Sequence, residues 1–352
     1  MKRSAVVFLL LALAGLPVAA QYEDEGTEDY EEQDRRYLER MKRAKQQAPP
    51  ESPIEDPSEE FLQLAEKLVR DKNYGSAETA RYRVQSDDPR LDADATARLL
   101  EQFRDFFEGY WQGPLELEPY DKTSRVFLLY SFHKYNQLLG GDFRFSKFRP
   151  QGHYGSSYDV ISLHSDSDGG EGATADGLIH EATHQLVDQA MFGALRTAPI
   201  WLSEGLASYF GYTRYDGDGF HPGVAGGKAV ALFRGSRGTA GDGARNQLKD
   251  FHRSRKLFER IGDELLVEHL LAVDTPGGFY GEQPQLHYAG SWLLVHTLLH
   301  AESGRFRAGF ERYIALEAAG AGGPAVLYQE TGLDPDRLQA VMDQHVRKIK
   351  TR

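Results

Sequence analysis

Cysteine is absent from the 352-residue sequence. Its absence excludes disulfide bonds, thiolate metal sites, iron–sulfur clusters, a cysteine nucleophile and a lipid-modified N-terminal cysteine. Any metal ion that the protein binds must therefore be held by histidine, aspartate or glutamate side chains. Export remains compatible with this composition, because a chain of this length can bury a hydrophobic core without disulfides.

Basic residues are outnumbered by acidic ones. The chain has 41 Lys and Arg against 53 Asp and Glu, which gives a formal net charge of -12. Nucleic acids attract clustered positive charge, and no basic stripe offsets the excess of acid, so we expect no nucleic-acid partner. The sequence also lacks the glycine pattern of a phosphate-binding loop and a serine nucleophile elbow.

Long apolar runs are scarce too, and the one that is present lies at the N-terminus. Lys2 and Arg3 precede an apolar stretch from Val6 to Leu16, which is followed by Pro17 and three small residues. This order is typical of a secretory signal peptide over residues 1–20. A membrane anchor is the alternative, but the run is short for a span and Pro17 interrupts it. We expect an exported protein, periplasmic or extracellular, with no membrane contact after cleavage.

Residues 21–57 are predicted to be a charged and proline-rich disordered linker, because an acidic block, a basic block and four prolines cannot bury a core. From residue 58 the hydrophobic pattern is that of a globular domain. Strands are predicted early and helices late, so the expected class is α+β. A small mixed sheet with helices is expected over 58–200 and a mostly helical part over 201–352. The predicted strands are 81–85, 124–130 and 159–164, and the predicted helices are 58–69, 92–111, 133–139, 178–191, 202–212, 256–273, 286–301, 305–318 and 335–350.

The most informative stretch lies in the helix predicted over 178–191. His180 and His184 are four residues apart, so their rings project from the same helix face, where two imidazoles can hold one Zn2+. Glu181 follows the first histidine and is close enough to meet a water molecule on that ion. This is the His-Glu-x-x-His arrangement of two metal ligands and a general base. The plainer interpretation is two histidines on a helix face beside an unrelated glutamate.

A second helix begins near Pro199 and carries Glu204, twenty positions after His184. A catalytic zinc site has three protein ligands and an open position for water. Glu204 is a plausible third ligand because the short connection over 192–198 can fold the second helix back against the first. Gly205, next to it, would permit close helix packing.

The two motifs together resemble those of the gluzincin metallopeptidases, and most closely those of the peptidase MA-like domains of exported bacterial proteins. The likeness extends from about Tyr82 to about Val346, and it is most specific at His-Glu-x-x-His and at the Trp-Leu-x-Glu-Gly-Leu-Ala sequence around Glu204. It implies a zincin-like metallopeptidase domain over 58–352, with a peptide or protein as substrate. It also implies that His180, His184 and Glu204 are the zinc ligands and that Glu181 is the catalytic base.

Two further expectations follow from the resemblance. The strand before the motif helix, 159–164, should border the substrate cleft. Many gluzincins have an acidic residue four positions after the glutamate ligand, and this chain has Ser208 there. A hydroxyl group can still hydrogen-bond an imidazole, although it orients the ring less strongly than a carboxylate does.

The implied chemistry is hydrolysis of a peptide bond by a zinc-bound water, with Glu181 taking the proton and passing it to the leaving amine. The negative intermediate needs a further hydrogen-bond donor. Tyr288 is the candidate because MA-like domains have a similar tyrosine where a later helix begins. His287 is the second candidate, and a tyrosine that only packs in the core is the plainer alternative.

Two histidines elsewhere have the same four-residue spacing, His296 and His300, but their neighbours are apolar and no glutamate lies between them. We expect them to pack in the core and not to bind a second metal. Two functional hypotheses then remain. The first is an active exported zinc peptidase, and the second is a non-catalytic envelope binding module that retains the metallopeptidase fold and the metal.

Overall fold

The computed structural model describes residues 35–36, 39–40, 43, 59–70, 74–118, 120–140, 150–156, 159–166, 170–193, 196–225, 232, 243–259, 264–281 and 283–349. The predicted signal peptide lies outside the described residues, as does most of the predicted linker. The few described residues of that linker are helical, and the guanidinium group of Arg40 lies 3.5 Å from the carboxylate of Glu330. Among the described helices, none has the combination of length and apolar character that crossing a membrane requires.

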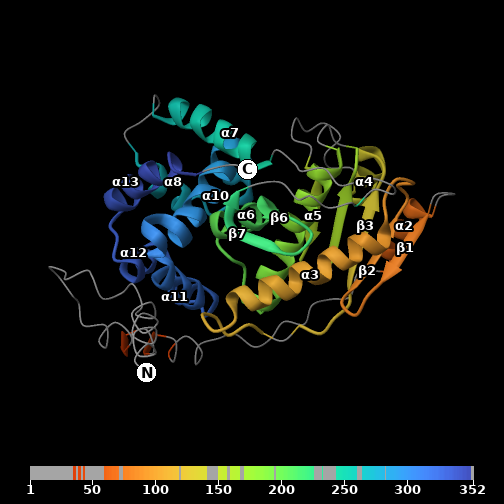
Figure 1. Cartoon of the computed structure of the whole chain (residues 1–352), viewed down its shortest axis with the longest axis horizontal. Helices are drawn as coiled ribbons and strands as arrows, with labels where there is room; N and C mark the ends of the chain where they lie inside the picture. The colour runs from red at the N-terminus through yellow and green to blue at the C-terminus, as the bar shows by residue number, and fades with distance from the viewer. Residues whose placement is uncertain are drawn as a thin grey trace, which may run out of the picture.

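Strands and helices alternate in the first part of the described chain, whereas helices dominate the second part (Figure 1). The elements up to the motif region are α2 (Glu59–Val69), β1 (Gly75–Glu78), β2 (Tyr82–Ser86), α3 (Ala93–Trp111), β3 (Ser124–Leu129), α4 (Phe132–Leu138), β4 (Gly152–Gly155), β5 (Val160–His164), α5 (Gly170–Leu186) and the π-helical turn η2 (Val187–Met191). The later elements are α6 (Ile200–Gly211), β6 (Thr213–Tyr215), β7 (Phe220–Ala225), α7 (Gly243–Phe258), α8 (Leu266–Ala272), α9 (Pro276–Phe279), α10 (Pro284–His300), η3 (Ala301–Gly304), α11 (Arg307–Ala318), α12 (Pro324–Thr331) and α13 (Pro335–Val346).

Five strands form one mixed sheet in the order β1-β2-β3-β5-β4. The three central strands run parallel, so that Val84 pairs with Val126 and Val126 pairs with Ile161. The edge strands β1 and β4 each pair antiparallel with their neighbour. The predicted α+β class with a small mixed sheet is therefore confirmed.

Helices cover both faces of this sheet (Figure 1). Side chains alternate along a strand, so β5 directs Ile161 and Leu163 to the face that packs on α3 and α5. Val160 points to the opposite face, where it packs with Leu138 of α4 and Ala65 of α2. The motif helix α5 is thus fixed against one face of a rigid sheet.

Helix α3 joins the sheet to the helical part. The side chain of Asp92 accepts a hydrogen bond from the backbone N–H of Ala95 at 3.0 Å and so caps the helix. The helix predicted over 92–111 is confirmed, and its aromatic side chains pack on α6: Phe103 and Phe107 are fully buried, and their ring centroids lie 5.9 and 5.3 Å from that of Phe210.

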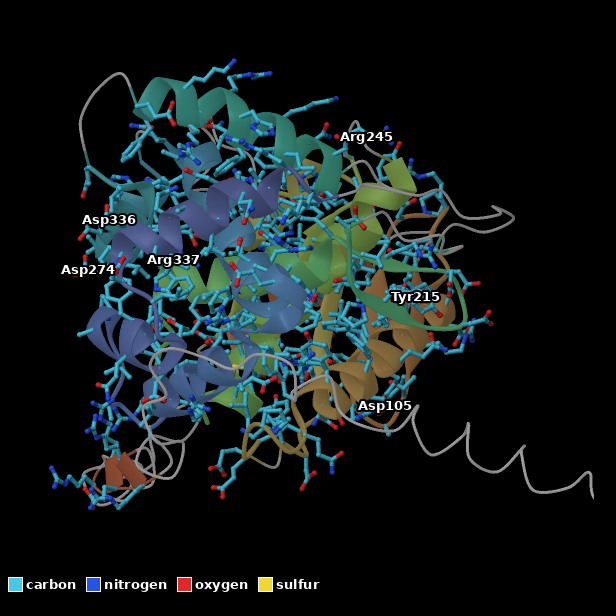
Figure 2. The ribbon with its side chains drawn as sticks, turned by 60° about the vertical axis from the view of Figure 1, so that its left-hand side comes forward. Asp105, Tyr215, Arg245, Asp274, Asp336 and Arg337 are labelled. Atoms are coloured by element: carbon cyan, nitrogen blue, oxygen red, sulfur yellow. The ribbon has the colours of Figure 1, made fainter. Side chains whose placement is uncertain are left out.

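The β6–β7 hairpin lies beside α3 as well. The hydroxyl group of Tyr215 donates a hydrogen bond to the Gln102 side chain of α3 at 2.7 Å. Figure 2 labels Tyr215 in this hairpin and, on the outer side of α3, Asp105. Helix α3 therefore packs its aromatic side chains on α6 and presents the face that carries Asp105 to solvent.

Helix α6 lies between α5 and α10. Gly205 does permit close packing as predicted, but the partner is α10 and not α5: a Cβ atom there would lie 2.7 Å from the Ser291 carbonyl oxygen. On the α5 side the corresponding position is Gly211, where a Cβ atom would lie 3.3 Å from the Cβ of His180. Two glycines on α6 thus let both neighbouring helices approach it closely.

The predicted boundaries of two helices are wrong. The motif helix begins earlier than predicted, at Gly170, and so includes Gly170, Gly172 and Gly177. Packing outweighs the weak helix propensity of glycine here, since Gly177 allows α5 to approach Leu163 of β5. The single helix predicted over 256–273 is two helices, because α7 ends at Phe258 and α8 begins at Leu266.

Candidate metal centre

Helices α5 and α6 bring the three predicted ligands together. His180 and His184 project from one face of α5, and Glu204 comes from α6, which begins directly after Pro199. Their ligand atoms all lie within 4.8 Å of one another. Within the described part of the chain, this is the one group of three or more such side chains that could hold a metal ion.

The spacing of the three ligand atoms fits a single tetrahedral ion. The Nε2 atoms of His180 and His184 are 3.2 Å apart, and Oε2 of Glu204 lies 3.3 and 3.5 Å from them. Zinc bonds to nitrogen and oxygen of about 2.0–2.2 Å place tetrahedral ligand atoms roughly 3.3–3.6 Å apart. The observed triangle is close in size to one face of such a tetrahedron, so the three side chains could hold one zinc ion.

The electrostatics of the centre favour a cation. Oε2 of Glu204 is buried and has no hydrogen-bond partner among the described residues. Burial alone would raise the pKa of Glu204, but the imidazoles of His184 and His180 outweigh it and hold that pKa well below its usual range. Burial would lower the pKa of His184, yet the adjacent carboxylates, Glu204 above all, raise it to about 9. A buried carboxylate that faces two imidazole nitrogens is a ligand set that zinc accepts.

Glu181 lies beside the ligands and against the edge strand. It is 7% exposed, and a Cβ atom at Gly152 of β4 would lie 2.7 Å from its Cγ and 2.8 Å from its Oε1. The absence of a side chain at Gly152 therefore leaves the space that the carboxylate occupies. Strand β5, which was expected to border the substrate cleft, lies inside the sheet, and β4 pairs on its outer side and meets Glu181. The place of the cleft stays a prediction.

A serine does hold a ligand, but it is not the predicted one. Nδ1 of His184 lies 2.8 Å from the hydroxyl oxygen of Ser203, so the ring can donate its N–H there while Nε2 faces the metal position. The hydroxyl group of Ser208 is buried and has no hydrogen-bond partner among the described residues. The expectation that Ser208 orients an imidazole is therefore wrong, and Ser203 has that position.

The segment 277–281 packs against the centre. Phe279 is fully buried, and its carbonyl group accepts a hydrogen bond from Nδ1 of His287 at 2.6 Å. The hydroxyl group of the next residue, Tyr280, donates to Oε1 of Glu204. The segment thus holds the carboxylate oxygen that faces away from the two imidazoles.

Tyr288 lies near the centre, on α10. Its ring centroid is 6.4 Å from that of His180 and 6.1 Å from that of Tyr280. Burial, followed by the negative charge of Glu204, raises the pKa of Tyr288 well above its usual value, so its hydroxyl group is a protonated donor at neutral pH. The structure therefore brings this predicted residue to the cluster.

The second candidate donor, His287, is engaged elsewhere. Nδ1 of its buried ring is bonded to the Phe279 carbonyl, and Nε2 lies 3.0 Å from Nε2 of His269. Both ring nitrogens are therefore occupied by other contacts. We assign His287 to holding the 277–281 segment and not to the reaction.

The remaining histidine pair packs in the core, as expected. Nδ1 of His296 lies 2.8 Å from Nε2 of His345, and Nε2 of His300 lies 2.7 Å from the hydroxyl group of Tyr209. Burial and then the neighbouring histidines lower the pKa of His296 to about 3. These rings stay neutral in the folded protein at ordinary pH.

Three residues at the centre escaped the sequence reasoning: Gly152, Ser203 and Tyr280. Ser203 directly precedes the glutamate ligand, so its position beside Glu204 is a usable signal. Tyr280 lies in the glycine-rich segment 277–281. Gly152 has no such signal, because β4 has only four residues and too short an alternation to mark a strand.

No protein-family model matches the chain, and no curated protein matches it. The likeness to the gluzincins therefore stands on the two motifs and remains a prediction.

Proposed function

We propose that the chain is an exported zinc-dependent peptidase of the gluzincin type, with a zincin-like fold. His180, His184 and Glu204 are its zinc ligands, and Glu181 is its general base. The observation that carries this proposal is the spacing of 3.2–3.5 Å between the three ligand atoms, with an acidic side chain one residue along the same helix. Such a set supports metal-assisted hydrolysis.

Zinc, when bound, lowers the pKa of a water molecule and polarises a peptide carbonyl group. Glu181 would accept a proton from water as the water oxygen bonds to the peptide carbonyl carbon, and would give that proton to the amine nitrogen as the carbon–nitrogen bond breaks. Its carboxylate lies against Gly152, which limits the space available to it. Ser203 fixes the ring of His184, so that one ligand keeps its orientation during the reaction.

Negative charge develops on the carbonyl oxygen and requires a donor from the protein. Tyr288 is the proposed donor because its ring lies near His180 and its hydroxyl group stays protonated. The hydroxyl group of Tyr280 donates to Glu204, which gives it a different task. We therefore assign Tyr280 to positioning the ligand and Tyr288 to the oxyanion.

The edge strand β4 supplies a place for the substrate backbone. Glu181 meets β4 at Gly152, and in the described part of the chain no strand pairs with the outer edge of β4. An extended peptide can add to such an edge by backbone hydrogen bonds. This placement brings a peptide bond next to the general base and supports a peptide or protein as the substrate.

The deciding experiment is digestion of a peptide library by zinc-loaded protein, with Glu181→Gln as the inactive variant. Glu181→Gln should keep its zinc and lose hydrolysis, because an amide does not accept the water proton. Glu268→Gln is the matched control, since Glu268 is exposed on α8, and it should cut as the wild type does. Zinc-loaded wild type that cuts no peptide or protein would support the non-catalytic binding module instead.

Export rests on residues 1–20 and is tested separately. Expression of the full chain in a bacterium, followed by fractionation and mass spectrometry, should give an exported protein that begins at Gln21. An intact N-terminus in the cytoplasmic fraction would contradict export without touching the proposed chemistry.

A further inference from the structure

A cavity of about 330 Å³ lies on the face of the sheet opposite α5. Its size is at the lower end of the range for ligand pockets in proteins, which is roughly 300–1,000 Å³. It lies between α2, the end of α4 and the outer strand β4, and we name it the β4 pocket. The residues that line it are Phe61, Leu138, Leu139, His153, Tyr154, Gly155, Ser156, Val160 and Ser162.

The β4 pocket and the metal centre share one strand. Side chains alternate along β4, so Gly152 and Tyr154 face α5, where Gly152 meets Glu181 and Tyr154 accepts a hydrogen bond from Gln189. His153 and Gly155 belong to the opposite face, which the register with Ser162 and Val160 of β5 confirms. Along β4, His153 in the wall of the pocket therefore directly follows Gly152, which contacts the general base.

A peptide that pairs with the outer edge of β4 would alternate in the same way, because residues opposite each other in a sheet share a face. Residues opposite Gly152 would face the metal centre, and those opposite His153 or Gly155 would face the pocket. Strand residues rise about 3.3 Å each, so the pocket lies within roughly three residues of the point opposite Gly152. Gly155 carries no side chain that could fill the opening.

We infer that the β4 pocket receives an apolar side chain of the substrate, at a position within three residues of the bond that is cut. This inference rests on the proposed function and adds a specificity determinant to it. The lining matches that occupant: three large apolar side chains come from α2 and α4, and Val160 closes the sheet side. A leucine or phenylalanine side chain buried there would leave water, which favours it over alanine.

The test compares matched peptides that have leucine or alanine at each of the three positions on either side of the cut. We expect wild type to prefer leucine at one of these positions by roughly 10- to 200-fold in kcat/KM, as apolar pockets do. Leu139→Asp places a charge in the pocket and should remove most of this preference. Ser156→Trp, an exposed residue at the pocket, should do the same by covering it without changing the core.

Leu64→Asp is the matched control, because Leu64 is on α2 with 36% of its surface exposed and does not line the pocket. It should keep the wild-type preference, and all variants should keep their zinc. Cleavage with no apolar preference at any of the six positions, or a preference that survives both pocket variants, would overturn this inference alone. Zinc-loaded wild type that cuts no peptide would overturn the proposed function, and the pocket assignment with it.

Discussion

The bond between Tyr280 and Glu204 makes the sharpest quantitative prediction. Glu204 is 4% exposed, and its two carboxylate oxygens have different tasks: Oε2 faces both imidazoles, and Oε1 accepts a hydrogen bond from the Tyr280 phenol. Tyr280→Phe removes that donor while keeping the ring. The carboxylate should then lose its fixed orientation toward the metal position.

The expected size of the effect follows from two independent scales. A hydrogen bond to a charged group contributes about 1.5–3 kcal/mol. Loss of a group that orients a metal ligand typically lowers metal affinity about 10- to 100-fold. Because 1.4 kcal/mol corresponds to a factor of ten, the two ranges overlap, and we expect the zinc Kd of Tyr280→Phe to rise about 10- to 100-fold.

The measurement is a competition titration of zinc against a chromophoric chelator at pH 7.5. Tyr130→Phe is the matched control, since Tyr130 is an exposed tyrosine away from the centre, and its zinc Kd should equal that of wild type. A zinc Kd for Tyr280→Phe equal to or lower than that of wild type would contradict this prediction, because it would mean that the hydrogen bond to Oε1 does not contribute to zinc affinity.

Three further predictions follow. Tyr288→Phe should lower kcat about 100- to 1000-fold while zinc content and Tm stay near wild type. A kcat equal to that of wild type, with or without a lower Tm, would show that Tyr288 packs in the core and does not stabilise the oxyanion. Burial and then neighbouring charges lower the pKa of His296 to about 3, and burial lowers those of His300 and His345 to about 4. Unfolded histidines titrate near 6.5, so the contribution of these three histidines to stability should be full above that pH and be lost as pH drops toward 4; the fall in the urea midpoint between pH 6.5 and 4, measured with a chelator, should be smaller in His296→Leu than in wild type. Gly205→Ala should cost about 1–3 kcal/mol in the free energy of unfolding, because its Cβ would overlap the Ser291 backbone and α10 would have to move; an unchanged urea midpoint would show that α6 and α10 are not held that closely.

The sequence predicted best where a local pattern decides the structure. Helix α3 was predicted over 92–111 and spans Ala93–Trp111, because apolar residues recur along one of its faces. The four-residue spacing of His180 and His184 determines their shared face on any helix. Glu204 was found because a short connection leaves few ways for α6 to return to α5. Local periodicity and chain connectivity were enough to predict that His180, His184 and Glu204 lie together.

The features that escaped prediction depend on contacts between distant segments. Strand β4 is too short to show a pattern, and it exists because it pairs with β5. Ser203 and not Ser208 reaches His184 because the orientation of α6 depends on its packing against two helices, which residue spacing alone does not determine. The contact of Tyr280 with Glu204 joins residues 76 positions apart and depends on the buried anchor Phe279.

The central claim is that one zinc ion lies between His180, His184 and Glu204. The most direct test is a crystal of the zinc-loaded protein, with anomalous scattering measured on both sides of the zinc edge. We predict one strong peak about 2.0–2.2 Å from Nε2 of both histidines and from a carboxylate oxygen of Glu204, and no such peak in His184→Ala. Zinc bound elsewhere in the chain, or no zinc at this position in a fully loaded crystal, would contradict the account.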